Sequence, residues 1–119
     1  MKRVIRSVPL KDTIKTLLFR PGEWERAVLT GALKGLRFRF DLRSDTQQWR
    51  GVYERPLQEW LTEYVWPGST CLDIGAGQGY LTVLMAKLAG PDGVVHAFEP
   101  SQQCERIAYH ARLNGPITS

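Results

Sequence analysis

The segment Leu72-Asp73-Ile74-Gly75-Ala76-Gly77-Gln78-Gly79-Tyr80 sets an acidic residue at the end of an apolar run, followed by three alternating glycines. Glycine permits the sharp backbone turn that a side chain resists, and it lets a ligand approach the backbone without meeting a Cβ atom. A helix that begins after the turn presents unpaired N–H groups and a partial positive charge to an anionic group. The segment therefore predicts a strand-to-helix turn built to contact a ligand.

The flanking residues alternate between strand and helix patterns. Thr70–Ile74 and Val94–Phe98 read as short buried strands, and Tyr80–Ala89 reads as a helix that ends at Gly90 and the turn after it. Ser101 is placed to cap a last helix. The predicted buried face of that helix consists of Cys104, Ile107, Ala108 and Ala111. This βαβα series predicts an α/β fold with parallel strands joined by right-handed crossovers.

The upstream half has a different pattern. Residues 36–42 alternate apolar and charged side chains, which predicts a strand with one buried face, and Ala27-Val28-Leu29 is placed to pair with it as a hairpin across Gly31 and Gly35. Helical spacing predicts one helix over residues 10–19. A second helix is predicted from Pro56, with an apolar face made of Leu57, Trp60, Leu61 and Tyr64. We therefore divide the chain into an N-terminal extension, residues 1–50, and a ligand-binding part, residues 51–119.

Composition narrows the class of protein. The chain has 119 residues and a net charge of +4, and residues 1–43 hold 11 basic side chains against 4 acidic ones. Basic and aromatic residues are not interleaved as they are in proteins that stack nucleic-acid bases, so no nucleic-acid partner is expected. Apolar stretches are too short for a transmembrane segment. The two cysteines, Cys71 and Cys104, lack metal-site spacing and are expected to be buried thiols in a cytoplasmic protein with no metal.

A second acidic residue points to a nucleoside ligand. Glu99 ends the next strand, 20 residues beyond Gly79, where a carboxylate accepts hydrogen bonds from ribose hydroxyls. Asp73 would repel a pyrophosphate and attract the ammonium of a methionine moiety. The glycine spacing also differs from the dinucleotide pattern, and no Gly-Lys-Ser/Thr follows as in a P-loop. The residues favour S-adenosylmethionine over NAD.

The whole pattern resembles the class I S-adenosylmethionine-dependent methyltransferases, and the flanking blocks look like the FkbM type. Those blocks are Gly51-Val-Tyr53-Glu54, Pro67-Gly68, Gly90-Pro-Asp-Gly93 and Ala97-Phe98-Glu99-Pro100. The resemblance covers roughly residues 27–115 and implies a Rossmann-like methyltransferase fold. It also implies methyl transfer, commonly to a hydroxyl oxygen of a sugar or another small-molecule acceptor.

The resemblance implies a role for each matching residue. Gly75 and Gly77 wrap the methionine end of the cofactor, Gly79 allows close packing at the helix start, Asp73 contacts the amino-acid portion and Glu99 binds the ribose. Tyr80 lines the pocket, and Tyr53 and Glu54 are further candidates, although Glu54 would also serve as an acidic first-turn residue. His96 is expected to be structural and His110 solvated. The cofactor-binding candidates are thus Asp73, Gly75, Gly77, Gly79, Tyr80 and Glu99.

The family fold continues after the second helix, with strands that carry the adenine-binding and acceptor-binding residues. We therefore expect an incomplete domain, truncated after the second βα unit, with no catalytic residue to name. A homo-oligomer or a missing C-terminal half would complete it. The alternatives are a non-catalytic fragment that binds S-adenosylmethionine or a protein partner, and an NAD-binding domain.

Overall fold

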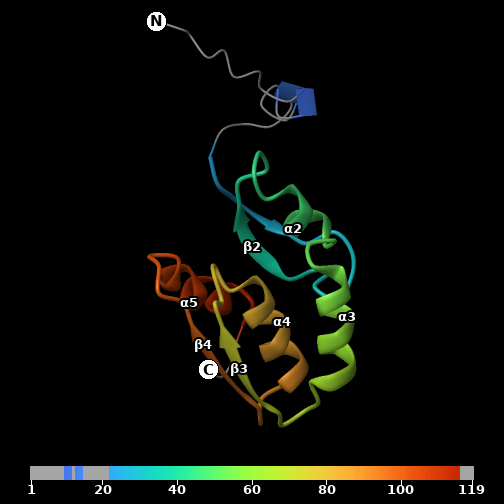
Figure 1. Ribbon diagram of the computed structural model, residues 1–119, viewed down its shortest axis with the longest axis vertical. Coiled ribbons are helices and arrows are strands. Elements are labelled where there is room, and N and C mark those ends of the chain that lie inside the picture. Colours follow the sequence, from blue (N-terminus) through green and yellow to red (C-terminus); the bar gives the residue numbers. More distant parts are fainter. Residues whose placement is uncertain (1–9, 12, 15–21, 116–119) are drawn as a thin grey trace, which may run out of the picture.

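A computed structural model describes residues 10–11, 13–14 and 22–115 (Figure 1). The helix predicted over residues 10–19 lies mostly outside the described residues, and the four of its positions that are described are helical. The remaining elements are β1 (Trp24–Ala27), β2 (Arg37–Phe40), α2 (Thr46–Arg50), α3 (Arg55–Tyr64), β3 (Thr70–Ile74), α4 (Tyr80–Ala89), β4 (Val94–Phe98) and α5 (Cys104–Leu113). The chain is a mixed α/β protein. No helix among the described residues is long and apolar enough to cross a bilayer.

The predicted hairpin is confirmed, with its first strand slightly earlier than expected. β1 pairs with β2 in antiparallel register, from Trp24 opposite Phe40 to Ala27 opposite Arg37. Phe38 and Phe40 are buried on one face, as the alternation in the sequence predicts. Gly31 and Gly35 both have positive φ angles in the connection between the strands. The hairpin forms a separate two-stranded sheet.

The second sheet carries the predicted strand–helix–strand unit. β3 and β4 pair in parallel, from Thr70 opposite Val94 to Ile74 opposite Phe98, and α4 connects them. Both strands and the helix begin and end where the sequence pattern places them. Because parallel strands have their carboxyl ends at the same edge, Asp73 and the residue after Phe98 are brought to one end of the sheet.

One apolar core joins the hairpin to the parallel unit. Phe38 lies against the ring of Tyr80 on α4, with ring centroids 5.1 Å apart. The buried cluster comprises Val28, Leu33, Phe38, Phe40, Leu42, Leu61, Tyr80, Val83, Leu84, Met85, Ala86 and Val95. Residues on both sides of position 50 thus contribute to the same core.

The buried face of α3 differs from the predicted one. Leu61 is buried as expected, but Leu57, Trp60 and Tyr64 are 41%, 53% and 57% exposed. Gln58 is buried instead, because its amide Nε2 donates hydrogen bonds to the carbonyl oxygens of Tyr53 and Gly51. The sequence spacing missed this face because a glutamine is buried only when such partners are present.

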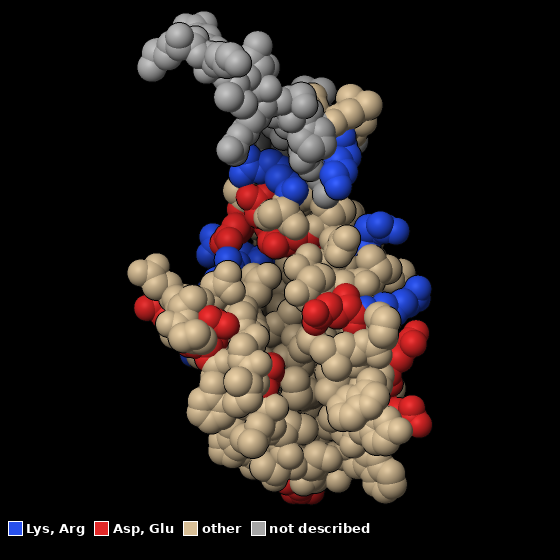
Figure 2. All heavy atoms as spheres, viewed as in Figure 1, with Lys and Arg blue, Asp and Glu red and all other residues tan. Residues whose placement is uncertain are grey.

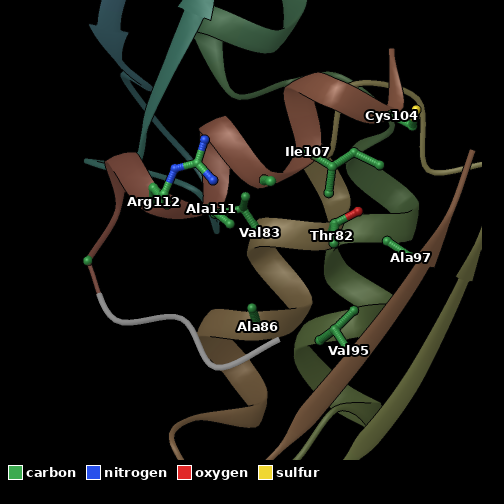
Figure 3. Close-up of a pocket in the computed structure, with 11 residues that line it drawn as sticks. Thr82, Val83, Ala86, Val95, Ala97, Cys104, Ile107, Ala111 and Arg112 are labelled. Carbon is green, nitrogen blue, oxygen red and sulfur yellow. The ribbon is translucent and has the colours of Figure 1, made fainter. Parts of the chain in front are cut away.

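The buried face of α5 is also different. Cys104 and Ala108 are exposed, and Ile107 and Ala111 are only partly buried. Together with side chains of α4 and β4 they line an apolar cavity of about 480 Å³ that Figure 3 shows between these elements. The expectation that both cysteines are buried is therefore wrong for Cys104, and Cys71 is partly exposed.

Two polar side chains of α5 and its C-cap residue Asn114 cover the edge of β2. Asn114 accepts a hydrogen bond from the N–H of Arg37 at 2.6 Å and donates one to its carbonyl at 2.8 Å. The N–H of Arg39 donates to Nε2 of His110 at 3.2 Å, and Arg106 donates to the Arg39 carbonyl at 2.9 Å. Three side chains spaced four residues apart thus take the place of a neighbouring strand and form hydrogen bonds with the backbone N–H and carbonyl groups at the edge of β2.

One face of the parallel sheet is exposed. Leu72, Ile74 and Phe98 are 66%, 75% and 53% exposed, whereas α4 covers the opposite face. Figure 2 shows most Lys and Arg side chains in the upper half of the view, whereas the lower half is mostly uncharged with scattered Asp and Glu side chains. The concentration of basic residues in the N-terminal part of the sequence is thus also a concentration in one part of the folded chain.

Candidate functional site

The glycine loop lies across the carboxyl ends of β3 and β4. The N–H groups of Gly75 and Ala76 both donate to the carbonyl of Phe98, at 2.9 and 3.0 Å, and so fix the start of the loop on the neighbouring strand. Gly75, Gly77 and Gly79 all have positive φ angles, between 58° and 91°. The loop needs glycines at these three positions because other residues rarely adopt this conformation.

The three glycines differ in their surroundings. A Cβ atom at Gly75 would meet nothing within 4 Å, so this position leaves open space beside the strand end. A Cβ atom at Gly79 would lie 3.2 Å from the Cα of Ile107 on α5. Gly79 therefore packs the loop against α5, while Gly75 leaves room for a ligand.

The loop and the N-terminal half of the chain enclose a cavity of about 330 Å³, at the small end of the range for ligand pockets. Asp73 lines it at the end of β3, and the Thr82 hydroxyl donates to its Oδ2 at 2.6 Å, which fixes the carboxylate. Its lining residues are Asp45, Gln48, Tyr53, Glu54, Asp73, Gly75, Ala76, Gly77, Gln78, Tyr80, Leu81 and Gln103.

Glu99 lies beside this cavity and binds the loop. Its two carboxylate oxygens accept hydrogen bonds from the N–H groups of Gly77 and Ser101, both at 2.9 Å. These hydrogen bonds, those from Ser101 first, lower the pKa of Glu99. The side chain is thus an anion at neutral pH, held at the carboxyl end of β4.

Tyr80 lines the cavity, but its hydroxyl is already engaged. The hydroxyl donates to the carbonyl of Gln48 on α2 at 2.8 Å, and the ring contacts Tyr53 edge to face. Burial raises the pKa of Tyr80, so the hydroxyl stays protonated. The ring serves as a wall of the cavity and ties α2 to the start of α4.

The segment before α3 supplies the wall opposite the loop. Tyr53 and Glu54 line the cavity, as the sequence suggested. Glu54 adopts a left-handed conformation with φ of 46°, uncommon for a residue other than glycine, at the N-cap of α3. Three further lining residues were not predicted from the sequence, because only the packing of α2 and α5 brings them to the cavity. They are Asp45, Gln48 and Gln103.

The structure places four predicted cofactor residues around the cavity and two beside it. Asp73, Gly75, Gly77 and Tyr80 line it, whereas Gly79 packs against α5 and Glu99 holds Gly77 from outside. Among the described residues, no group of three or more His, Cys, Asp or Glu side chains is arranged to hold a metal ion. The polar groups present are carboxylates, which accept hydrogen bonds, and backbone N–H groups, which donate them, and the open space at Gly75 leaves room for a ligand of the expected kind.

Comparison with known proteins gives a family assignment. Residues 55–114 match the family model described as protein-L-isoaspartate(D-aspartate) O-methyltransferase. A protein-L-isoaspartate O-methyltransferase of Triticum aestivum is 49% identical over 35 residues, which cover 29% of this chain and 15% of the relative. One of Aeropyrum pernix is 44% identical over 48 residues, which cover 40% of this chain and 17% of the relative. No solved structure matches significantly.

These matches confirm the class of protein expected from the sequence and correct the type within it. The resemblance to class I S-adenosylmethionine-dependent methyltransferases is supported, but the matched family is not the FkbM type. The glycine loop and both acidic strand ends lie inside the matched residues 55–114. These motifs are shared within the class, so they could not separate the two types.

Proposed function

Because the chain belongs to the protein-L-isoaspartate O-methyltransferase family, whose members use S-adenosyl-L-methionine as methyl donor, we propose that it binds this cofactor at the glycine loop. The observation that carries the proposal is the position of Asp73 and Glu99 at the ends of two paired parallel strands, with the loop between them. When bound, the cofactor supplies a methyl group activated by a sulfonium.

Each end of the proposed site suits a different part of the cofactor. Asp73 is held by Thr82 and faces the cavity, where its charge would attract the ammonium of the methionine moiety. Glu99 is held by two N–H groups, and ribose hydroxyls would share its oxygens with them. Gly75, directly after the end of β3, leaves open space beside the loop because a Cβ atom there would meet nothing within 4 Å.

The opposite wall adds negative charge. Asp45 and Glu54 line the same cavity as Asp73. A site with three carboxylates favours a cationic ligand, and the sulfonium gives S-adenosylmethionine one more positive charge than its demethylated product. Burial raises the pKa of Asp45, so its contribution is greatest at neutral and higher pH.

For the whole protein we propose transfer of the methyl group to a carboxylate of a protein acceptor, the isoaspartyl group named in the family description. Class I methyl transfer relies mainly on aligning the nucleophile with the methyl carbon and the sulfur. The described residues supply the cofactor side of that alignment. We assign the acceptor side to a further segment like those in the unmatched parts of the relatives, of which this chain matches 15% and 17%.

The acceptor is tested with labelled S-adenosylmethionine and two peptides that differ only in an isoaspartyl or an ordinary aspartyl residue. The chain is assayed alone and fused to the C-terminal portion of the Aeropyrum pernix relative. We expect the fusion to label the isoaspartyl peptide as a methyl ester, which base hydrolyses to methanol, and the chain alone to bind the cofactor without turnover.

The other outcomes are equally informative. A base-stable methyl ether on a sugar or other hydroxyl acceptor would return the protein to the FkbM type and contradict the proposed acceptor. Turnover by the chain alone would overturn the expectation of an incomplete domain. A fusion that binds the cofactor but labels neither peptide would contradict the proposed acceptor.

A further inference from the structure

His110 on α5 is completely buried, contrary to the expectation that it is solvated. Its ring lies edge to face against Phe38 on β2, with centroids 5.1 Å apart. Its two ring nitrogens contact two separate elements. Nδ1 is 2.8 Å from the carbonyl oxygen of Gln78 in the glycine loop, and Nε2 is 3.2 Å from the backbone nitrogen of Arg39 on β2.

The two partners fix the protonation state of the ring. The Arg39 N–H can only donate, so Nε2 must carry a free lone pair. The Gln78 carbonyl can only accept, so Nδ1 must carry the proton. Both contacts are satisfied by the neutral imidazole with its proton on Nδ1, and by no other form of the ring.

We propose that His110 is a positioning residue for the cofactor loop: its neutral ring holds the Gln78 carbonyl, and protonation of Nε2 pushes the ring away from the Arg39 N–H, which shifts the loop bound on its other side and weakens cofactor binding. This inference rests on the proposed function of the loop. Gln78 stands between Gly77, whose N–H is bound by Glu99, and Gly79, which packs against α5. The loop is therefore held by Glu99 on one side and by His110 on the other.

Protonation opposes the Arg39 contact directly, whereas the N–H on Nδ1 still donates to the Gln78 carbonyl. A proton on Nε2 would point at the Arg39 N–H, so two donors would face each other in a buried position without an acceptor. Burial, the largest influence, lowers the pKa of His110, and the nearby guanidinium of Arg106 acts in the same direction. The hydrogen bond to Gln78 and the carboxylate of Glu23 act in the opposite direction.

The charged groups around the ring come from three elements. Arg106, one turn earlier on α5, pairs with Glu23 at 2.6 Å and so compensates much of the negative charge near the ring. Tyr109 contacts the ring and also hydrogen-bonds Glu25 of β1. The groups to consider are Arg39, Arg106, Tyr109, Glu23 and Glu25. None offers the ring an acceptor for a second proton in the observed geometry.

The sign of the pH effect follows from these contacts. Because the pKa of His110 is lowered in the folded chain, the neutral ring prevails at neutral pH and the effect begins only below the ordinary value of about 6.5. Below the pKa of the ring in the ligand-free chain, cofactor affinity should fall, by up to tenfold per pH unit. Above it, affinity should be constant with respect to this group.

The test compares the wild type with His110→Gln and His96→Gln. Glutamine has a donor group and an acceptor group but does not titrate, and the other histidine, His96, is exposed on β4. S-adenosylhomocysteine is titrated calorimetrically from about pH 7.5 down to about pH 4.5, a range that extends well below the ordinary imidazole pKa and so includes a lowered one. We expect the wild type and His96→Gln to lose affinity together, and His110→Gln to show a flatter profile. Asp45 titrates in all three proteins and therefore cancels in the comparison.

A second readout needs no cofactor. Nitrogen chemical shifts of the ligand-free wild type should show His110 protonated on Nδ1 and unprotonated on Nε2, and amide protection from Gln78 to Tyr80 should fall as the ring titrates. A proton on Nε2 at neutral pH would overturn the inference. So would amide protection that stays constant as the ring titrates, or identical pH profiles of the wild type and His110→Gln. If His110→Gln does not fold, the shifts and the protection decide. If the wild type does not bind S-adenosylhomocysteine at neutral pH, the proposed function fails. The chemical shifts and the amide protection then still test whether His110 positions the loop.

Discussion

Replacing Asp73 by Asn is expected to weaken binding of S-adenosylhomocysteine about 10- to 100-fold, the range for a lost charged hydrogen bond of about 1.5–3 kcal/mol. Asparagine keeps an oxygen that accepts from the Thr82 hydroxyl, so the end of β3 should keep its shape. The lost charge faces the cavity where the ammonium of the ligand would lie. Calorimetric titration of both proteins measures the ratio of the two Kd values.

A second ligand and a second variant make this prediction specific. 5′-Methylthioadenosine has the ribose and adenine but no amino-acid portion, so Asp73→Asn should leave its affinity unchanged. Glu99→Gln should weaken both ligands, because both contain the ribose. Equal losses for both ligands with Asp73→Asn would contradict the assignment of Asp73 to the ammonium, and unchanged affinity with Glu99→Gln would contradict the assignment of Glu99 to the ribose.

Replacing Phe38 by Ala is expected to lower the free energy of unfolding by about 3–5 kcal/mol, a large part of the stability of a small domain. Phe38 is 1% exposed and contacts the rings of Phe40, Tyr80 and His110, which come from three elements. The truncation would leave a cavity where the hairpin, α4 and α5 meet. Urea unfolding of the two proteins, followed by circular dichroism, gives the difference.

Phe98→Ala is the matched control for this prediction. It removes the same atoms, but Phe98 is 53% exposed at the end of β4, so we expect a loss of less than about 1 kcal/mol. A similar loss for both variants would show that the hairpin is not packed on α4 as described. Cofactor binding by the Phe38 variant should decline together with its folded fraction.

Local patterns predicted the parallel unit well. β3, α4 and β4 begin and end where the apolar runs, the glycine turn and the Pro91-Asp92 turn place them. These signals depend on residues close together in the chain, as does the alternation that predicts β2. The hairpin pairing follows from the same alternation and the glycines between the strands.

Helix faces were harder to predict because their partners are distant in sequence. Apolar spacing on α5 suggests a face around Ile107, yet the helix is held to β2 by Arg106, His110 and Asn114. Polar side chains at a four-residue spacing usually indicate a solvated face. They are buried or bound here because the β2 edge, about seventy residues earlier, offers four backbone groups to them.

The candidate site shows the same division. The glycine loop and the two acidic strand ends belong to one strand–helix–strand unit, and the structure places them together. Asp45, Gln48 and Gln103 complete the cavity, but they come from α2 and from the approach to α5, which the motif does not include. The class-wide motif also explains why the comparisons support the methyltransferase class that the sequence suggests but not the FkbM type.

The central claim is that the loop between Asp73 and Glu99 binds S-adenosylmethionine. The most direct measurement is calorimetric titration of the wild-type chain with S-adenosylhomocysteine at about pH 7.5, where His110 is neutral. We predict saturable binding of one ligand per chain with a Kd below about 100 μM. No binding heat at ligand concentrations of about 1 mM, with the chain shown to be folded, would contradict the claim.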